Sequence, residues 1–139
     1  MTTDQLYDPK LETMPWDDVQ KMTFEAAREQ LERVYARSPF YRRRFDEAGV
    51  TPSDVRQPED LVRIPLMDKE QERQSQDDDP PFGEHLCADR DDVVRIYASS
   101  GTTGRPTFFA LTQRDLDNQT TVMARVFHTA GIRKSDTMG

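Results

Sequence analysis

The chain is poor in sulfur and in metal-binding side chains. It contains one cysteine, Cys87, and two histidines in 139 residues. A single cysteine excludes a disulfide framework and a CxxC metal motif, and such a residue is more often an inert small side chain than a nucleophile. His85 and His128 lie far apart and lack the spacing of zinc ligands, so we predict no metal site.

A surplus of basic residues is also missing. The formal net charge is -7, which argues against a nucleic-acid or anionic-membrane binder because both partners attract a basic face. The densest basic run is Arg42–Arg44, and Asp46 and Glu47 follow it closely. This setting favours a solvated helix face over an interaction patch, and both interpretations stay open.

Long apolar stretches are absent as well. The first residues, MTTDQLYDPKLETMPWDD, carry acids and lack the apolar centre of a signal peptide. No run approaches the length of a transmembrane helix. We therefore expect a protein of the reducing cytoplasm, without a membrane partner.

The chain is rich in charged residues and in apolar residues that recur at helical intervals. Hydrophobic residues make up 35% and charged residues 32% of the chain. Residues 1–14 show little periodicity and are expected to form a loosely ordered arm. A helix is predicted to begin near Pro15, because apolar residues then recur at steps of three and four. These residues are Phe24, Ala27, Leu31, Val34 and Tyr35. Such a stripe is more often core than an interface.

Residues 15–92 are predicted to be a mainly helical segment. A second helix is expected over Phe40–Ala48. Beyond it, repeated prolines limit regular structure to short turns, one of them polar and following Asp68. QSQDDD at 74–79 is expected to be a solvated loop.

Residues 93–139 follow a different pattern. Two runs of β-branched and aromatic residues, Val93–Tyr97 and Thr107–Leu111, predict strands. Thr112 then caps a helix predicted over 113–130, whose apolar face is expected to leave uncovered surface. Strand, loop, strand and helix open an α/β domain, so the predicted fold class is α/β with a helical N-terminal segment.

Between the two predicted strands lies a loop crowded with hydroxyls and glycines. Such residues let backbone N–H groups converge on an anion, and Arg105 adds a fork of donors suited to phosphate. The candidate ligand-binding residues are Ser99, Ser100, Gly101, Thr102, Thr103, Gly104 and Arg105. The loop lacks the spacing and lysine of a Walker A motif and is not GxGxxG. Residue chemistry alone leaves an ordinary loop, the commoner case, and a phosphate cradle both open.

YASSGTTGRPT, however, resembles the phosphate-binding loop of the adenylate-forming superfamily. Thr107 after Pro106 is similar to the phenylacetate-CoA ligase branch of that superfamily. Further segments that resemble the N-terminal part of this branch are SPFYRRRFDEAGV at 38–50, DLVRIPLMDK at 60–69 and FALTQRDLDN at 109–118. Arg105 stands where the branch often has lysine, which keeps the charge and changes its reach.

The resemblance implies an ATP-dependent ligase for an aryl acid of the phenylacetate type. Such enzymes form an acyl-adenylate and pyrophosphate, and coenzyme A then displaces AMP, with Mg²⁺ accompanying the nucleotide. The loop of the family grips the β- and γ-phosphates. Residues 93–139 would be the start of the AMP-binding domain, the catalytic lysine is expected beyond Gly139, and the chain alone is expected to be inactive. The resemblance also implies a homodimer.

Two alternatives stay open beside this interpretation. One is a ligase for a different acid. The other is a truncated relative that serves as a non-catalytic helical interaction or oligomerisation module.

Overall fold

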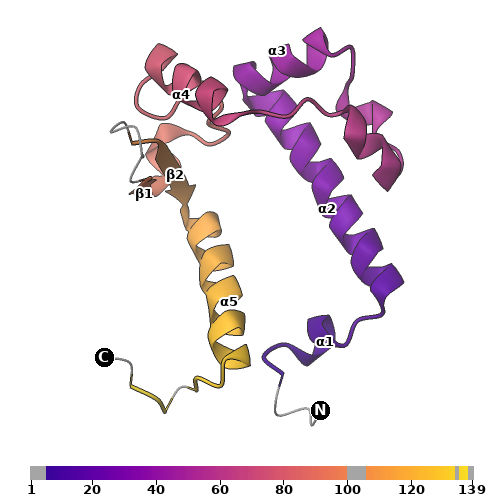
Figure 1. Cartoon of the computed structure of the whole chain (residues 1–139), viewed down its shortest axis with the longest axis vertical. Coiled ribbons are helices and arrows are strands. Elements are labelled where there is room, and N and C mark those ends of the chain that lie inside the picture. Colours follow the sequence, from indigo (N-terminus) through magenta and orange to yellow (C-terminus); the bar gives the residue numbers. More distant parts are fainter. Residues whose placement is uncertain (1–5, 100–105, 134, 138–139) are drawn as a thin grey trace.

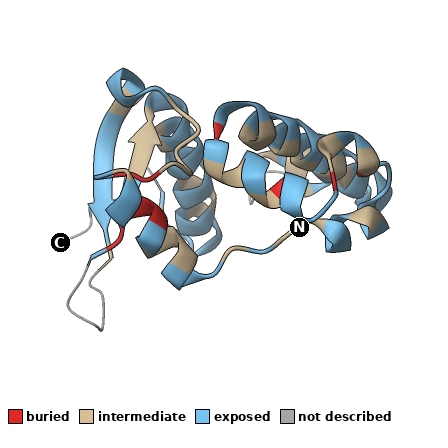
Figure 2. Cartoon of the chain, turned by 90° about the horizontal axis from the view of Figure 1, so that it is seen from above, coloured by how far each residue is buried: buried red, intermediate tan, exposed pale blue. Residues whose placement is uncertain are grey.

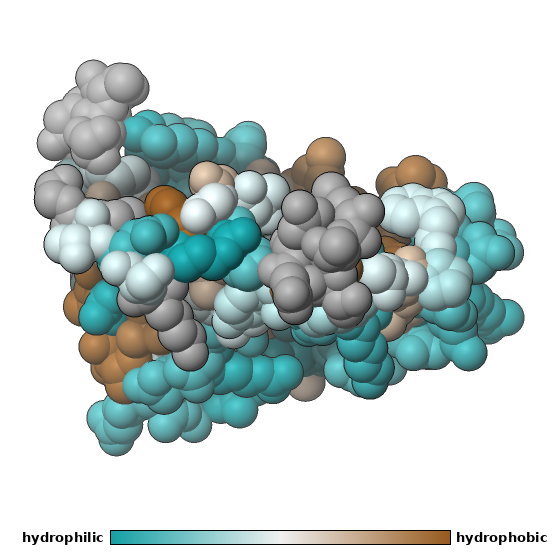
Figure 3. Space-filling model, turned by 90° about the horizontal axis from the view of Figure 1, so that it is seen from below, coloured by the Kyte–Doolittle hydropathy of each residue, from teal (hydrophilic) through white to brown (hydrophobic). Residues whose placement is uncertain are grey.

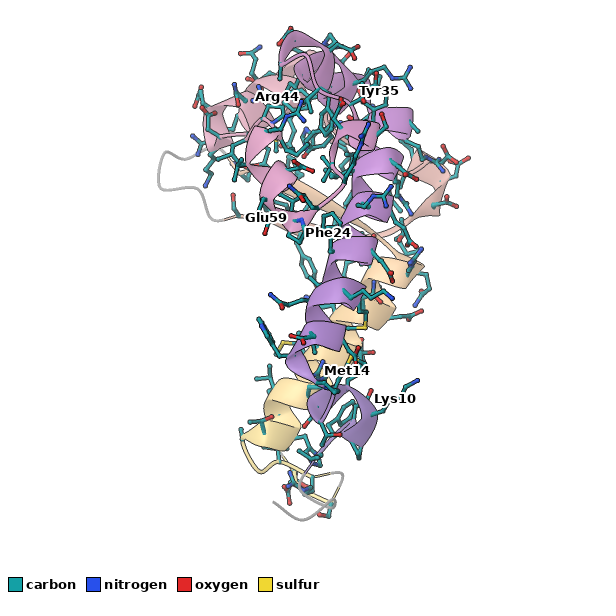
Figure 4. All side chains as sticks on the ribbon, turned by 90° about the vertical axis from the view of Figure 1, so that its right-hand side faces the viewer. Lys10, Met14, Phe24, Tyr35, Arg44 and Glu59 are labelled. Atoms are coloured by element: carbon teal, nitrogen blue, oxygen red, sulfur yellow. The ribbon has the colours of Figure 1, made fainter. Side chains whose placement is uncertain are left out.

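The structure, a computed structural model, describes residues 6–99, 106–133 and 135–137. Two long helices, α2 (Trp16–Arg37) and α5 (Gln113–Thr129), extend below a layer of shorter helices and a two-stranded sheet (Figure 1). The two helices are splayed apart in that view, and from its right-hand side α2 lies in front of α5 (Figure 4).

The first helices begin at well-defined caps. α1 (Pro9–Glu12) is capped by Asp8, and α3 (Pro39–Glu47) is capped by Ser38. The Ser38 hydroxyl accepts a hydrogen bond from the Tyr41 N–H at 3.2 Å, which satisfies one of the free donors of the first turn. The sequence predicted this helix one residue later at each end, over Phe40–Ala48, and its existence is confirmed.

α2 carries the predicted apolar face. The residues of this face that are only partly exposed are Phe24, Ala27, Leu31, Val34 and Tyr35. Figure 4 shows Phe24 near the middle of the helix and Tyr35 toward its upper end. The Tyr35 ring lies 5.7 Å from the ring of Phe45 on α3, which is 1% exposed. The upper end of the stripe therefore packs against α3, while no residue of α2 is fully buried.

The arginine run on α3 is tied to other parts of the chain. Arg42 and Arg43 are exposed, in agreement with the predicted helix face. The Arg42 guanidinium donates to the carbonyls of Tyr35 and Ala36. Arg43 donates to the carboxylate of Glu84, and Arg44 donates to the carbonyl of Leu66. Since these groups already have partners inside the chain, the interaction-patch interpretation loses support.

One prediction is wrong, because QSQDDD is not a loop. Most of it belongs to α4 (Lys69–Asp78), which extends the predicted polar turn. Asp68 and Gln71 form a capping box: the Gln71 N–H donates to Asp68 at 2.8 Å, and the Asp68 N–H donates back at 3.1 Å. Ser75 and Gln76 are buried, at 4% and 8% exposure. Apolar periodicity missed this helix because its buried face is polar.

The rest of the proline-rich stretch forms the expected short turns. These are the 3₁₀ helices η2 (Pro52–Asp54), η3 (Pro58–Arg63) and η4 (Arg90–Asp92). The first two begin at a proline, whose fixed φ suits the first helical position. η4 leads directly into the sheet.

β1 (Val93–Ala98) and β2 (Phe108–Thr112) pair in an antiparallel manner, with Ala98 opposite Phe108. Thr112 then caps α5, and its N–H donates to the Asp115 carboxylate at 2.8 Å in the expected capping box. Both strands, this helix and the α/β class with a helical N-terminal segment are confirmed. The domain boundaries remain predictions.

The fully buried apolar part of the described chain is small, as the few red segments in Figure 2 show. Its members are Phe45, Val50, Val55 and Phe82. Large apolar side chains are exposed on both strands and on α5: Val94, Ile96, Tyr97, Phe108, Phe109, Val122, Met123, Val126 and Phe127. Apolar patches also stand out on the surface in Figure 3. The uncovered surface predicted for the 113–130 helix is thus confirmed.

Among the described residues, no helix is both long and apolar enough to cross a membrane.

Gly83 offers a test of how the segment after α4 packs. Its φ is +81°, and a Cβ placed there would lie 2.6 Å from Nδ1 of His85 and 2.7 Å from Oγ of Ser75. We predict that Gly83→Ala destabilises the protein by roughly 2–4 kcal/mol, the sum of backbone strain and overpacking. Gly49→Ala is the matched control, because φ is +62° there with no atom within 4 Å, and it should cost only about 1 kcal/mol. Thermal unfolding that ranks the two variants equally would contradict this packing.

Candidate functional site

The candidate phosphate loop joins β1 to β2, and the structure describes its two ends. The Ser99 N–H donates to the Thr107 carbonyl at 2.9 Å, and the Thr107 N–H donates to the Ser99 hydroxyl at 3.1 Å. These two bonds close the base of the loop. The other candidate residues, Ser100, Gly101, Thr102, Thr103, Gly104 and Arg105, lie outside the described residues. Their assignment as ligand-binding residues remains a prediction.

Ser99 has a structural task that the sequence did not indicate. Its hydroxyl takes the place of a backbone carbonyl in the strand pairing, because it accepts the Thr107 N–H. A hydroxyl that accepts one hydrogen bond can still donate its own hydrogen. Ser99 can therefore hold the loop closed and offer a donor to an anion at the same time.

Thr107 anchors the exit of the loop. It is completely buried, at 0% exposure. Within the described ranges, its Oγ1 has no hydrogen-bond partner. A buried hydroxyl without a partner is costly.

Gln76 is a residue of the site that sequence reasoning missed. Its amide NH₂ donates to the Phe108 carbonyl at 2.7 Å, and its amide oxygen accepts the Phe108 N–H at 3.1 Å. α4 is thereby bonded to the first residue of the strand that follows the loop. The only sequence signal for this helix was the capping pair Asp68 and Gln71, since no apolar residue marks its inner face.

α4 is in turn held by the segment that follows it. The Ser75 hydroxyl and Nδ1 of His85 are hydrogen-bonded at 3.0 Å. Burial lowers the pKa of His85, while the Glu72 carboxylate works in the opposite direction. The His85 ring therefore favours its neutral form in this position.

A cleft of about 740 Å³ opens between α2, the 82–88 segment, β2 and the start of α5. Its walls mix apolar and charged side chains, including Leu111, Arg33 and Glu72. Cys87 also lines it, and burial raises the pKa of this thiol above its usual value. A raised pKa reduces the thiolate fraction, which supports the interpretation of Cys87 as unreactive. In the described parts of the chain, no three His, Cys, Asp or Glu side chains gather as a metal site.

Curated relatives of this chain are named phenylacetate-coenzyme A ligase. The chain is 43% identical over 128 residues to the phenylacetate-coenzyme A ligase of Thermus thermophilus, a match that covers 92% of this chain and 28% of that enzyme. It is 40% identical over 131 residues to the enzyme of the same name from Escherichia coli, over 94% of this chain and 29% of that enzyme. The chain thus spans less than a third of the length of these relatives. No protein-family model matches it.

Solved structures of CoA ligases share this fold. One is 2-hydroxyisobutyryl-CoA ligase in complex with 2-HIB-AMP and CoA in the thioesterification state, with a TM-score of 0.89 and 33% identity over 98% of this chain and 29% of that one. A second is the postadenylation state of that ligase with 2-HIB-AMP, with a TM-score of 0.88 and 31% identity over 98% of this chain and 28% of that one. The fold of this chain therefore recurs in a ligase whose structures contain 2-HIB-AMP.

The lowered pKa of His85 predicts how the stability of the protein depends on pH. The folded pKa lies below the ordinary value of 6.5, so the unfolded chain binds the proton more readily. The stability linked to His85 is therefore fully present above about pH 6.5 and is lost as pH falls through the folded pKa. His85→Gln removes this titration, so the midpoint of thermal unfolding of the variant should fall less than that of the wild type between neutral pH and about pH 5. Parallel pH profiles of the two proteins would contradict the assignment.

Proposed function

Because this chain corresponds to the N-terminal portion of the phenylacetate-CoA ligase family of adenylate-forming enzymes, we propose that the complete protein is an ATP-dependent aryl-acid CoA ligase. The observation that carries the proposal is the relation over 92% of the chain to enzymes of that name. The SGTTGRPT loop, closed at its base by Ser99 and Thr107, stands between two strands in this chain.

The proposed reaction has two steps. A carboxylate oxygen of the acid attacks the α-phosphorus of ATP, the bond from that phosphorus to the bridging oxygen breaks, and pyrophosphate leaves. The sulfur of coenzyme A then attacks the acyl carbon, its proton goes to a base or to water, and AMP leaves. Phosphoryl-group chemistry of this kind depends mainly on positioning and charge neutralisation.

The loop residues fit the leaving group by their chemistry. Pyrophosphate is an anion with many acceptor oxygens, and Ser99, Ser100, Thr102 and Thr103 supply hydroxyl donors. Gly101 and Gly104 permit the backbone angles with which successive N–H groups converge on an anion. Arg105 adds a permanent positive charge. We assign these residues to the β- and γ-phosphates, and Mg²⁺ would be held mainly by phosphate oxygens and water.

Further parts of the proposal rest on the family relation alone. The catalytic lysine is expected beyond Gly139, and a homodimer stays a prediction. A cytoplasmic location is expected from the sequence and not from the family relation, and it also stays a prediction. The relatives do not favour the alternative of a non-catalytic interaction module, because they are named as enzymes. The structural neighbour is named for 2-hydroxyisobutyryl-CoA, so a nonaromatic hydroxy acid is the second candidate substrate.

The proposal predicts acid-dependent pyrophosphate release by the complete gene product. With ATP, Mg²⁺ and CoA, phenylacetate should support release and acyl-CoA formation, and omission of the acid should abolish both. The panel should include benzoate, hydroxylated aryl acids and 2-hydroxyisobutyrate, because these separate the two candidate acid classes. If no acid supports release, the ligase proposal fails.

Gly101 tests the role of the loop. Gly101→Val places a branched side chain where the backbone is proposed to contact phosphate, so kcat/KM for ATP should fall by roughly a hundredfold or more. The second half-reaction, started from a supplied acyl-adenylate and CoA, should continue in the same variant because it needs no pyrophosphate grip. Equal use of ATP by the variant and the wild type would show that the loop is not a phosphate cradle.

A further inference from the structure

Phe108, the first residue of β2, faces α4 along the edge of β2 that is not paired with β1. In an antiparallel pair, hydrogen-bonded and non-hydrogen-bonded residue pairs alternate. Ser99 and Thr107 form a hydrogen-bonded pair at the base of the loop. The next pair, Ala98 and Phe108, is therefore a non-hydrogen-bonded one. The N–H and C=O of Phe108 point away from β1 and need partners elsewhere.

Gln76 supplies both partners with one side chain. Its amide donates to the Phe108 carbonyl at 2.7 Å and accepts from the Phe108 N–H at 3.1 Å. A side-chain amide carries a neutral donor and an acceptor side by side, so this one residue satisfies both groups of Phe108. The amide thus imitates one residue of a neighbouring strand. Gln76 is only 8% exposed, so water does not readily replace these bonds.

The contact fixes the loop at a second point. The first point is the closed base at Ser99 and Thr107, and Phe108 is the next residue along the strand. Because Ser75 also binds His85 at 3.0 Å, α4 is itself anchored, and Gln76 links that anchored helix to the exit of the loop. A loop whose donors must meet phosphate oxygens within a fraction of an ångström depends on fixed ends.

We propose that Gln76 is a positioning residue for the phosphate loop: it sets the affinity for the ATP phosphates through Phe108 and Thr107 without touching the nucleotide. This inference rests on the proposed ligase function. It assigns a role in catalysis to a helix that carries no residue of the loop itself.

The first test replaces Gln76 with methionine in the complete gene product. Gln76→Met keeps the volume and removes both bonds, so KM for ATP should rise by roughly ten- to a hundredfold, while KM for the acid and for CoA stay unchanged. Gln74→Met is the matched control on the same helix. Gln74 is exposed, and its side chain donates to Asp78 on the same helix at 2.8 Å, so this variant should match the wild type.

The second test uses Gln76→Glu, which probes the donor alone. Its carboxylate can accept the Phe108 N–H but cannot donate to the carbonyl, whereas the protonated acid can do both. The ratio of its KM for ATP to that of the wild type should therefore fall as pH is lowered. The charged neighbours from α4 are Arg73 and Asp77, which line the same small cleft as Gln76 and Phe108. The corresponding ratio for Gln76→Met should stay flat.

The outcomes separate the inference from the proposed function. If the wild type releases no pyrophosphate with any acid, the proposed function fails and this inference fails with it. If the wild type is active but Gln76→Met behaves like Gln74→Met, the inference alone is overturned. Should Gln76→Met not fold, the pH profile of Gln76→Glu decides, and a flat ratio overturns the positioning role.

Discussion

The paired hydrogen bonds between Gln76 and Phe108 join the helical part of the chain to the strand that leaves the loop. Apolar packing contributes little to this junction, since three of the four fully buried apolar residues, Phe45, Val50 and Val55, belong to α3 and the turns after it. Each hydrogen bond contributes only about 1 kcal/mol net, but a buried backbone group left without a partner costs more. The junction is therefore specific in geometry, because the single amide of Gln76 satisfies both groups of Phe108 at once.

A net charge of -7 bears on how such a protein could hold a polyphosphate. This segment by itself gives no long-range attraction for an anion, so any affinity that it contributes has to come from short-range donors at fixed positions. Backbone N–H groups, hydroxyls and one guanidinium are donors of this kind. Their usefulness depends on their placement, and the described ends of the loop are held by several hydrogen bonds. The Ser99 hydroxyl, the buried Thr107 and the Gln76 amide all act within two residues of the loop exit or entrance.

The helices and strands whose apolar residues recur with a regular period could be predicted from the sequence. α2, both strands and α5 each show the spacing of their class, and the Thr112 cap has a clear signature. α4 could not be recognised as a full helix, because Ser75 and Gln76 face inward for hydrogen bonding rather than for burial of apolar surface. Gln76 could not be identified as a member of the candidate site for a related reason. Its partner is a backbone group 32 residues away, and a backbone partner leaves no residue type to recognise.

Under the proposed function, the phosphate loop would bear on the reaction class and not on the acid, and the reason is chemical. Every adenylate-forming reaction releases the same pyrophosphate, so a loop that holds it need not change with the acid. Discrimination between acids comes from pocket contacts with the acyl group, where one methylene is worth about 1–3 kcal/mol. A relative named for phenylacetate is 43% identical to this chain, and a structure named for 2-hydroxyisobutyryl-CoA is 33% identical to it.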